Sequence, residues 1–187
     1  LDEADRGNYD LILQAVPHFV DQQGSMFFPS CYDDTIMGPL GIEKTSDVGF
    51  CGNIINRGAL ISAIDKQYGI KQDIFVIGDA MVQAINSYKI HFNANISVDI
   101  NFRNFETIGC GTCLLTSGHP AYGVLGFIDG ENCLIYNSID DMLDKIGETL
   151  KDDEKRIRIA NAGLQLARKH TYKERAKQIL TLLQGAD

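Results

Sequence analysis

The 187-residue sequence lacks the features that mark several broad classes of protein. No apolar run approaches the ~20 residues that a membrane-spanning helix requires, and the opening residues LDEADRGNYD have no signal-peptide pattern. Basic residues are outnumbered, with 17 Lys and Arg against 25 Asp and Glu and a net charge of −8. This balance argues against a binding surface for nucleic acid or for an anionic membrane.

Several familiar active-site motifs are missing as well. The sequence contains no G-x-G-x-x-G for a classical dinucleotide site, no G-x-x-x-x-G-K-[ST] for a P-loop and no G-x-S-x-G for a nucleophile elbow. The four histidines are scattered, with none at metal-ligand spacing, and His91 lies in a predicted buried strand. We therefore expect no structural metal and no bound cofactor, and a core role for His91.

The five cysteines are odd in number and lie mostly inside apolar runs. This is typical of buried free thiols in a reducing compartment, so we expect a cytoplasmic protein. Cys110 and Cys113 form a C-x-x-C, but no second pair of zinc ligands is spaced nearby. Cys110 lies at a predicted helix end and Cys113 in the next strand, whereas the cysteines of a redox pair normally lie at the start of a helix. The spacing therefore favours neither a zinc site nor a redox site.

From residue 47 the sequence alternates between strands and helices. Strands are predicted at 48–51, 73–77, 88–94, 112–116 and 132–136, with helices at 55–68 and 81–87 and three further helices after Ser138. Strands separated by helices indicate a doubly wound, Rossmann-like parallel sheet with helices on both faces. The first 46 residues hold a predicted strand at 9–16 but do not form a self-sufficient unit. They are expected to be the end of another domain and a linker, with residues 47–187 as the main domain.

The most informative stretch runs from Asp99 to Thr116. Apolar residues at helical spacing predict an amphipathic helix, which Asp99 or Asn101 caps and Gly111 ends before a buried strand. Arg103 and Glu106 lie three residues apart near its N-terminus. Free helix amides and a guanidinium bind phosphate, and a carboxylate accepts hydrogen bonds from vicinal hydroxyls, so this pattern suits a phosphorylated sugar ligand. The alternative is a surface ion pair.

Two glycine pairs follow predicted strands, where doubly wound sheets bind their ligands. Gly52-Asn53 precedes a helix that carries Arg57, a pattern that suits phosphate binding, although such a pair is also common in simple turns. Gly78-Asp79 follows the next strand and is a candidate edge for a nucleotide base. Alternatively, Asp79 caps the next helix.

Three sequence blocks together resemble one family. They are DVGFCGNIINRGALISAI (47–64), NFRNFETIGCGTCLLT (101–116) and HTYKERAKQIL (170–180), joined by LGFIDGENCLIYNSIDDMLDKI (125–146). They are similar to the C-terminal domain of group 1 glycosyltransferases with the GT-B fold, in the branch of spore-maturation-like proteins. That branch has a pattern N-x-R-x-F-E followed by a glycine and an apolar strand. Here the pattern is formed by Asn101, Arg103, Phe105, Glu106 and Gly111.

The resemblance implies a Rossmann-like domain that binds a nucleotide-diphosphate sugar, most simply a UDP-sugar, for transfer of a hexosyl group. By position, Glu106 holds the ribose. The diphosphate faces Asn101 and Arg103 of the pattern. Gly52 and Asn53 lie beneath it, with Arg57 nearby. Gly78 and Asp79 border the base. The resemblance assigns no catalytic base.

The sequence departs from the family in two ways. Many group 1 enzymes have a second glutamate eight positions before the ribose-binding one, where this chain has Val98. The N-terminal acceptor-binding domain is largely absent, and the first residue is not Met, so we expect a fragment that binds donor but does not complete transfer alone. The acceptor is unknown. Two alternatives remain open: a nucleotide-sugar epimerase of the same fold, and a non-catalytic module that binds carbohydrate or a partner.

Overall fold

The structure, a computed structural model, describes residues 8–20, 25–96 and 98–184. Its centre is a parallel sheet in the order β4-β3-β5-β6-β7, formed by β3 (Ser46–Gly52), β4 (Lys71–Ile74), β5 (Tyr88–Phe92), β6 (Cys113–Ser117) and β7 (Leu134–Tyr136). The helices are α2 (Gly58–Tyr68), α3 (Gly78–Ser87), α4 (Phe102–Gly109), α5 (Tyr122–Leu125), α6 (Ile139–Leu150), α7 (Asp153–Ala167) and α8 (Tyr172–Gln184). Apart from the sheet lie the paired strands β1 (Leu13–Gln14) and β2 (Met26–Phe27) and the 3-10 helix η1 (Pro17–Phe19).

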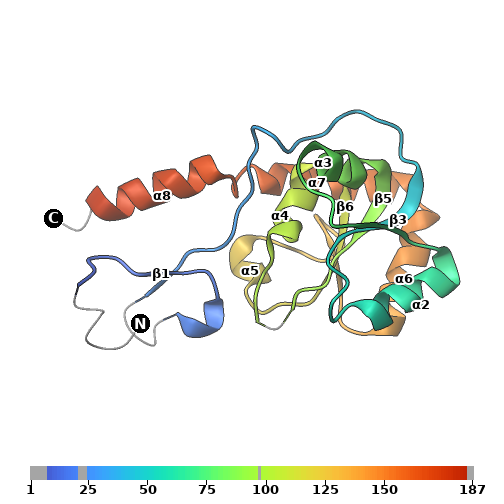
Figure 1. The fold of residues 1–187 in the computed structure, drawn as a ribbon, viewed down its shortest axis with the longest axis horizontal. Helices are drawn as coiled ribbons and strands as arrows, with labels where there is room; N and C mark the ends of the chain where they lie inside the picture. Colours follow the sequence, from blue (N-terminus) through green and yellow to red (C-terminus); the bar gives the residue numbers. More distant parts are fainter. Residues whose placement is uncertain (1–7, 21–24, 97, 185–187) are drawn as a thin grey trace.

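Two hydrophobic layers cover the two faces of the sheet. On β6, Leu114 packs into the layer beneath α3, α4 and α5, whereas Cys113 and Leu115 pack into the layer beneath α2 and α6. Because successive strand residues point to opposite faces, a strand buried on both sides needs an unbroken apolar run, and β6 has one. Figure 1 shows α2 and α6 on one side of the sheet and α3 and α4 on the other. The predicted Rossmann-like architecture is therefore confirmed.

Helix α4 forms where its sequence pattern predicts it. Phe105 and Ile108 are fully buried, and Gly111 adopts φ +67°, just beyond the helix end. The amide of Gly111 donates to Ile108 O, and the amide of Thr112 donates to Thr107 O. These two bonds make a Schellman motif, which needs a left-handed residue that glycine adopts without strain. Ser138 also caps α6 as predicted, because its Oγ accepts a hydrogen bond from Asp141 N at 3.1 Å.

Some predicted boundaries were wrong. The predicted strand at 9–16 contains only the short β1, and the predicted strand at 73–77 is instead β4, which ends at Ile74. Phe75 follows with φ +60°, a backbone conformation that no strand residue adopts, and α3 begins earlier than predicted, at Gly78. The short helix α5 was not predicted.

All five cysteines are free and buried, as predicted. Cys110 and Cys113 lie in the two different hydrophobic layers, on opposite faces of the sheet. Their C-x-x-C spacing therefore reflects a helix end and a strand start, and both thiols pack as apolar groups.

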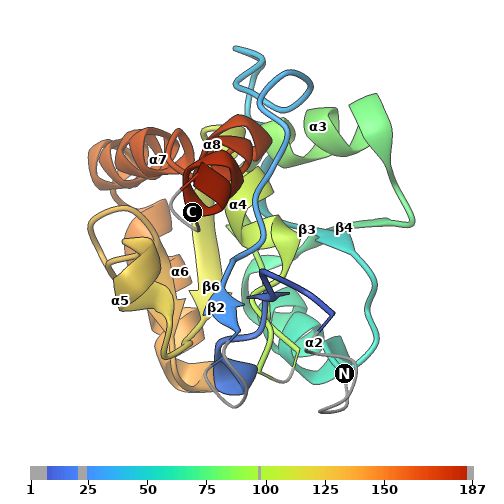
Figure 2. The same ribbon diagram turned by 90° about the vertical axis from the view of Figure 1, so that its left-hand side faces the viewer.

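The segment that leads into β3 packs against the helices of the main sheet. Tyr32 is buried, its amide donates to His170 O, and its carbonyl accepts from Tyr172 N at the start of α8. A Cβ added at Gly109 would lie 2.4 Å from the Tyr32 ring, so glycine permits this close contact. Figure 2 shows the segment passing beside α8. The division at residues 46 and 47 stays a prediction. Among the described helices, none is long and apolar enough to cross a membrane.

Candidate functional site

The polar residues singled out in the sequence gather at the carboxyl edge of the sheet, where β3 and β5 lie side by side. From β3 the chain crosses to β4 on one side, and from β5 it crosses to β6 on the other. Such a switch point leaves a crevice in which doubly wound sheets bind ligands. A cavity of about 520 Å³ lies there. Its lining comprises Phe50, Cys51, Gly52, Asn53, Arg57, Asn93, Asn101, Phe102, Arg103, Glu106 and Tyr172.

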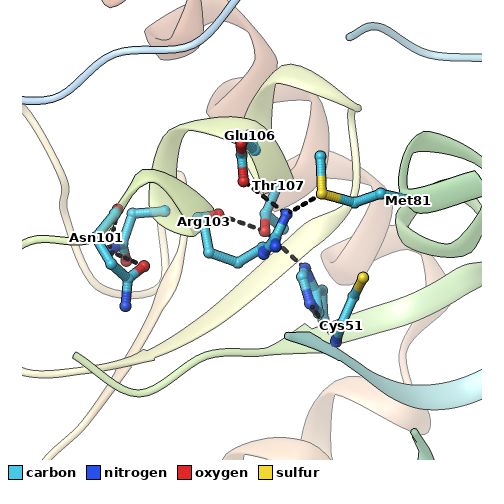
Figure 3. Close-up of polar contacts among 8 residues, drawn as sticks. Cys51, Met81, Asn101, Arg103, Glu106 and Thr107 are labelled. Carbon is cyan, nitrogen blue, oxygen red and sulfur yellow. Dashed lines mark hydrogen bonds and ion pairs between the residues drawn. The ribbon is translucent and has the colours of Figure 1, made fainter. Parts of the chain in front are cut away.

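Arg103 and Glu106 form an ion pair inside this cavity, one turn apart on α4 (Figure 3). Arg103 Nη1 lies 2.6 Å from Glu106 Oε2 and 2.8 Å from Met81 Sδ of α3. Each charged side chain is only 18% exposed. Burial raises the pKa of Glu106, and the charge of Arg103 opposes that rise. The pair is thus a partly dehydrated element of the cavity wall, unlike the surface ion pair that the sequence left as an alternative.

Arg57 is buried at the start of α2, where it ties two loops of the cavity together. Its Nε and Nη2 donate to Ala94 O at 3.1 and 2.8 Å, and its Nη1 donates to Asn53 O at 2.9 Å. Burial lowers the pKa of Arg57, and the nearby charge of Arg103 lowers it further. The charged residues of the lining are thus two arginines, Arg57 and Arg103, and one carboxylate, Glu106. This excess of positive charge favours an anionic ligand.

The N-terminus of α4 opens towards the same cavity. Asn101 occupies the N-cap position, but its side chain makes no capping hydrogen bond with the helix amides. Instead its Nδ2 donates to Ala94 O at 3.2 Å. The predicted cap at Asn101 is therefore correct in position and wrong in its side-chain bond. The amide of Asn104 donates to Asn101 O at 3.2 Å, and the residues that begin the helix, Asn101, Phe102 and Arg103, line the cavity. The positive end of the helix dipole there favours an anion.

A buried network of polar side chains holds this helix end in place. Asn104, fully buried, donates through Nδ2 to Asn95 Oδ1 at 2.8 Å and to Asn101 O at 3.1 Å. Its Oδ1 accepts from Thr116 Oγ1 at 2.9 Å and from Tyr122 Oη at 3.0 Å. Because each buried polar group has a partner, the network fixes the start of α4 relative to β5 and β6.

The structure brings most of the predicted site residues together. Gly52, Asn53, Arg57, Asn101, Arg103 and Glu106 all line the cavity. Gly78 and Asp79 begin α3 and do not belong to the lining. Asp79 lies in the first turn of α3 and is not its cap, because the N-cap residue is Ile77. The base-edge assignment of Gly78 and Asp79 stays a prediction.

The sequence analysis missed five of the lining residues. Phe50, Cys51 and Asn93 lie at the ends of β3 and β5, so the position of the strand ends was a usable signal for them. Phe102 is the first residue of α4, and its side chain is half exposed at the cavity. Tyr172 comes from the start of α8, far along the chain, and no local pattern connects it to the site.

Another large cavity lies apart from the predicted site residues. A groove of about 700 Å³ lies between β2, α5 and α8 and contains none of the predicted site residues. Within residues 8–20, 25–96 and 98–184, no group of three or more His, Cys, Asp or Glu side chains is arranged to hold a metal ion.

Comparison with known proteins connects this geometry to one family. A profile of the family described as "Glycosyl transferase-like" matches residues 49–181, which include every residue of the cavity lining. The chain belongs to this glycosyl transferase-like family. No curated protein matches the sequence.

Several solved structures share the fold of this chain. A sucrose-phosphate synthase from Thermosynechococcus elongatus matches with a TM-score of 0.72 and 11% identity, over 95% of this chain and 58% of that one. Anabaena HepE, solved with UDP and glucose, matches with a TM-score of 0.75 and 13% identity, over 94% and 63%. The C-terminal domain of a glycosyl transferase group 1 family protein (LpcC) from Francisella tularensis matches with a TM-score of 0.60 and 14% identity, over 73% and 96%.

The chain covers very different shares of these three solved structures. The chain spans about three fifths of the synthase and of HepE, 58% and 63% respectively. It covers nearly all of the separate C-terminal domain, 96%. At these identities the likeness shows the glycosyl transferase-like fold alone.

Proposed function

We propose that this chain is the donor-binding, C-terminal part of a two-domain GT-B glycosyltransferase of group 1, in the spore-maturation-like branch. It binds a nucleotide-diphosphate sugar, a UDP-hexose in the simplest case, and needs no metal ion. The acceptor and its binding domain lie outside residues 47–187. The proposal places the protein in the cytoplasm, where nucleotide sugars are available.

One observation carries this proposal: the Arg103–Glu106 pair lies at the open N-terminus of α4, inside the switch-point cavity. A nucleotide sugar presents two chemical groups that match these elements. Its diphosphate suits the α4 amides and the guanidinium of Arg103, and its ribose hydroxyls suit the carboxylate of Glu106. HepE, which shares the fold, was solved with UDP and with UDP-glucose, and this supports the same class of ligand here.

The remaining residues have assigned roles in the proposed complex. Gly52 and Asn53 lie beneath the diphosphate, and Arg57 holds their loop and adds positive charge. Gly78 and Asp79 border the base. Transfer of the sugar leaves negative charge on the departing diphosphate, and fixed amides and guanidinium groups stabilise such charge in the transition state. None of these residues is assigned as a catalytic base.

Titration calorimetry tests the proposal directly. The 187-residue chain is titrated with UDP, GDP, ADP and CMP, beside Glu106→Gln and the exposed control Glu154→Gln on α7. We expect selective binding of UDP that Glu106→Gln weakens and Glu154→Gln leaves unchanged. Binding of no nucleotide by the wild-type chain, or equal binding by Glu106→Gln, contradicts the proposal. Product analysis on a longer chain that includes the acceptor domain then separates a transferase from an epimerase of the same fold.

A further inference from the structure

A buried imidazole fills the gap where β3 and β5 separate. Pairing between these strands ends at Gly49 and His91, whereas β3 continues to pair with β4 as far as Gly52. Beyond the last β5 pair, the amide of Cys51 donates to Nε2 of the His91 side chain at 3.2 Å. The His91 ring is completely buried. The His91 side chain thus accepts the hydrogen bond that a backbone carbonyl of β5 would accept in a continued ladder, and its donor, Cys51, lines the cavity.

The chemistry of the partners fixes the direction of every hydrogen bond that follows. An amide can only donate, so Nε2 of His91 is an acceptor and the ring proton sits on Nδ1. Nδ1 lies 2.7 Å from Thr107 Oγ1 and donates to it, and the Thr107 hydroxyl donates to Arg103 O at 2.6 Å. Burial keeps the pKa of His91 well below its usual value, and the charges of Arg103 and Lys44 lower it further, so the ring stays neutral.

This relay connects the two walls of the cavity that the proposed function assigns to the diphosphate. One end is Cys51, which directly precedes Gly52 and Asn53 on the β3 side. The other end is the carbonyl of Arg103, in the first turn of α4. Resting on the proposed function, we propose that His91 and Thr107 are positioning residues that set the spacing between the β3 loop and α4 for binding of the donor diphosphate. Neither side chain touches the ligand.

Thr107 provides the sharpest test, because valine copies its shape without the hydroxyl. In Thr107→Val the Nδ1–H of His91 loses its acceptor, whereas Thr107→Ser keeps the relay. Ile159→Val, in the hydrophobic layer on the opposite face of the sheet, serves as a control for lowered stability alone. Each chain is titrated with UDP and with uridine, which lacks the diphosphate, at a temperature well below its thermal midpoint.

We expect Thr107→Val to weaken UDP binding about tenfold, the effect of one hydrogen bond of ordinary net strength, and to change uridine binding by less than about twofold. Thr107→Ser and Ile159→Val bind both ligands as the wild type does. The inference is overturned if Thr107→Val binds UDP normally, or if it loses UDP and uridine affinity in equal proportion. Absence of nucleotide binding by the wild-type chain overturns the proposed function, and this inference with it.

A second measurement tests the relay without any ligand. The ¹⁵N resonances of the His91 ring distinguish a protonated Nδ1 from a protonated Nε2. The relay requires the neutral Nδ1–H form in the wild-type chain and in Thr107→Ser. A protonated Nε2 overturns the inference whatever the nucleotide affinity, because the Cys51 amide then has no acceptor on the ring.

Discussion

Arg103 Nη1 and Glu106 Oε2 lie 2.6 Å apart on adjacent turns of α4, and burial raises the pKa of that carboxyl group. The pair is open to the cavity yet only 18% exposed on either side chain. Each partner therefore restrains the other until a ligand arrives. An anionic group can replace Glu106 as the partner of Arg103, and hydroxyl donors can replace Arg103 as the partner of Glu106. Neither exchange needs more than a small rearrangement of the helix.

The raised pKa of Glu106 predicts a pH effect on stability. A carboxyl group whose pKa is higher in the folded chain stabilises the fold below its unfolded pKa of about 4.5, and this contribution is lost as pH rises through the folded value. Glutamine does not titrate. We therefore expect the free energy of unfolding of the wild type minus that of Glu106→Gln to fall as pH rises above about 4.5. Urea denaturation of both chains at several pH values measures this difference. A difference in unfolding free energy that stays constant or rises with pH contradicts the prediction.

Substitutions at Arg103 test whether this residue binds the diphosphate and not the ribose. Lysine keeps the positive charge but lacks the planar fork that binds Glu106 and a phosphate group together. We expect Arg103→Lys to weaken UDP binding by about tenfold and Arg103→Ala by more than that. Uridine binding changes less in both. The exposed residue Arg158 of α7 provides a matched control as Arg158→Lys. Equal losses for UDP and uridine contradict the assignment of Arg103 to the diphosphate.

Local patterns predicted the parts of the site that lie within one segment. The spacing of Phe105 and Ile108, the candidate caps at Asp99 and Asn101 and the stop at Gly111 are all local, and they placed α4 between the predicted cap and Gly111. The end of β4 was missed because it depends on the left-handed backbone at Phe75, which no residue preference indicates. Tyr172 was missed because its place in the cavity depends on the packing of α8 against Tyr32.

The buried network around Asn104 predicts a large loss of stability on its removal. In Asn104→Ala, the hydroxyls of Thr116 and Tyr122 and the amide oxygen of Asn95 each lose a buried partner. The two hydroxyls can still pair with each other at 3.0 Å, so one buried hydroxyl proton is left without an acceptor, and the Asn104 bond to Asn101 O is lost as well. An unsatisfied buried group costs about 1–3 kcal/mol, so together with the lost bonds we expect a loss of about 3 kcal/mol. Asn161→Ala, at an exposed position of α7, is the matched control. Equal urea midpoints for the two variants contradict the prediction.

The packing of the segment before β3 predicts how the chain responds to truncation. Tyr32 and Met37 belong to the hydrophobic layer beneath α4, although they precede the predicted domain boundary at residues 46 and 47. Loss of a large buried side chain costs about 2–5 kcal/mol. We expect residues 47–184 to be less stable than residues 28–184 by about 4 kcal/mol or more, as measured by urea denaturation. Equal stability of the two chains would contradict this prediction, because it would show that the segment before residue 47 does not contribute to the stability of the fold.

His170 predicts a second, opposite pH effect. Its Nε2 donates to Leu125 O and its Nδ1 accepts from Arg175, and burial together with the charge of Arg175 lowers the pKa of His170 to about 4. A lowered pKa stabilises the fold above the unfolded value of about 6.5, and that stability, about 3 kcal/mol, is lost as pH falls towards 4. His91 acts in the same direction, so wild-type stability falls steeply over this range.

In His170→Gln we expect the free energy of unfolding, measured by urea denaturation, to fall less steeply between pH 7 and pH 4, because glutamine does not titrate. Ile159→Val lowers stability without changing the slope. A slope in His170→Gln equal to that of Ile159→Val means that the His170 ring titrates alike in the folded and unfolded chains.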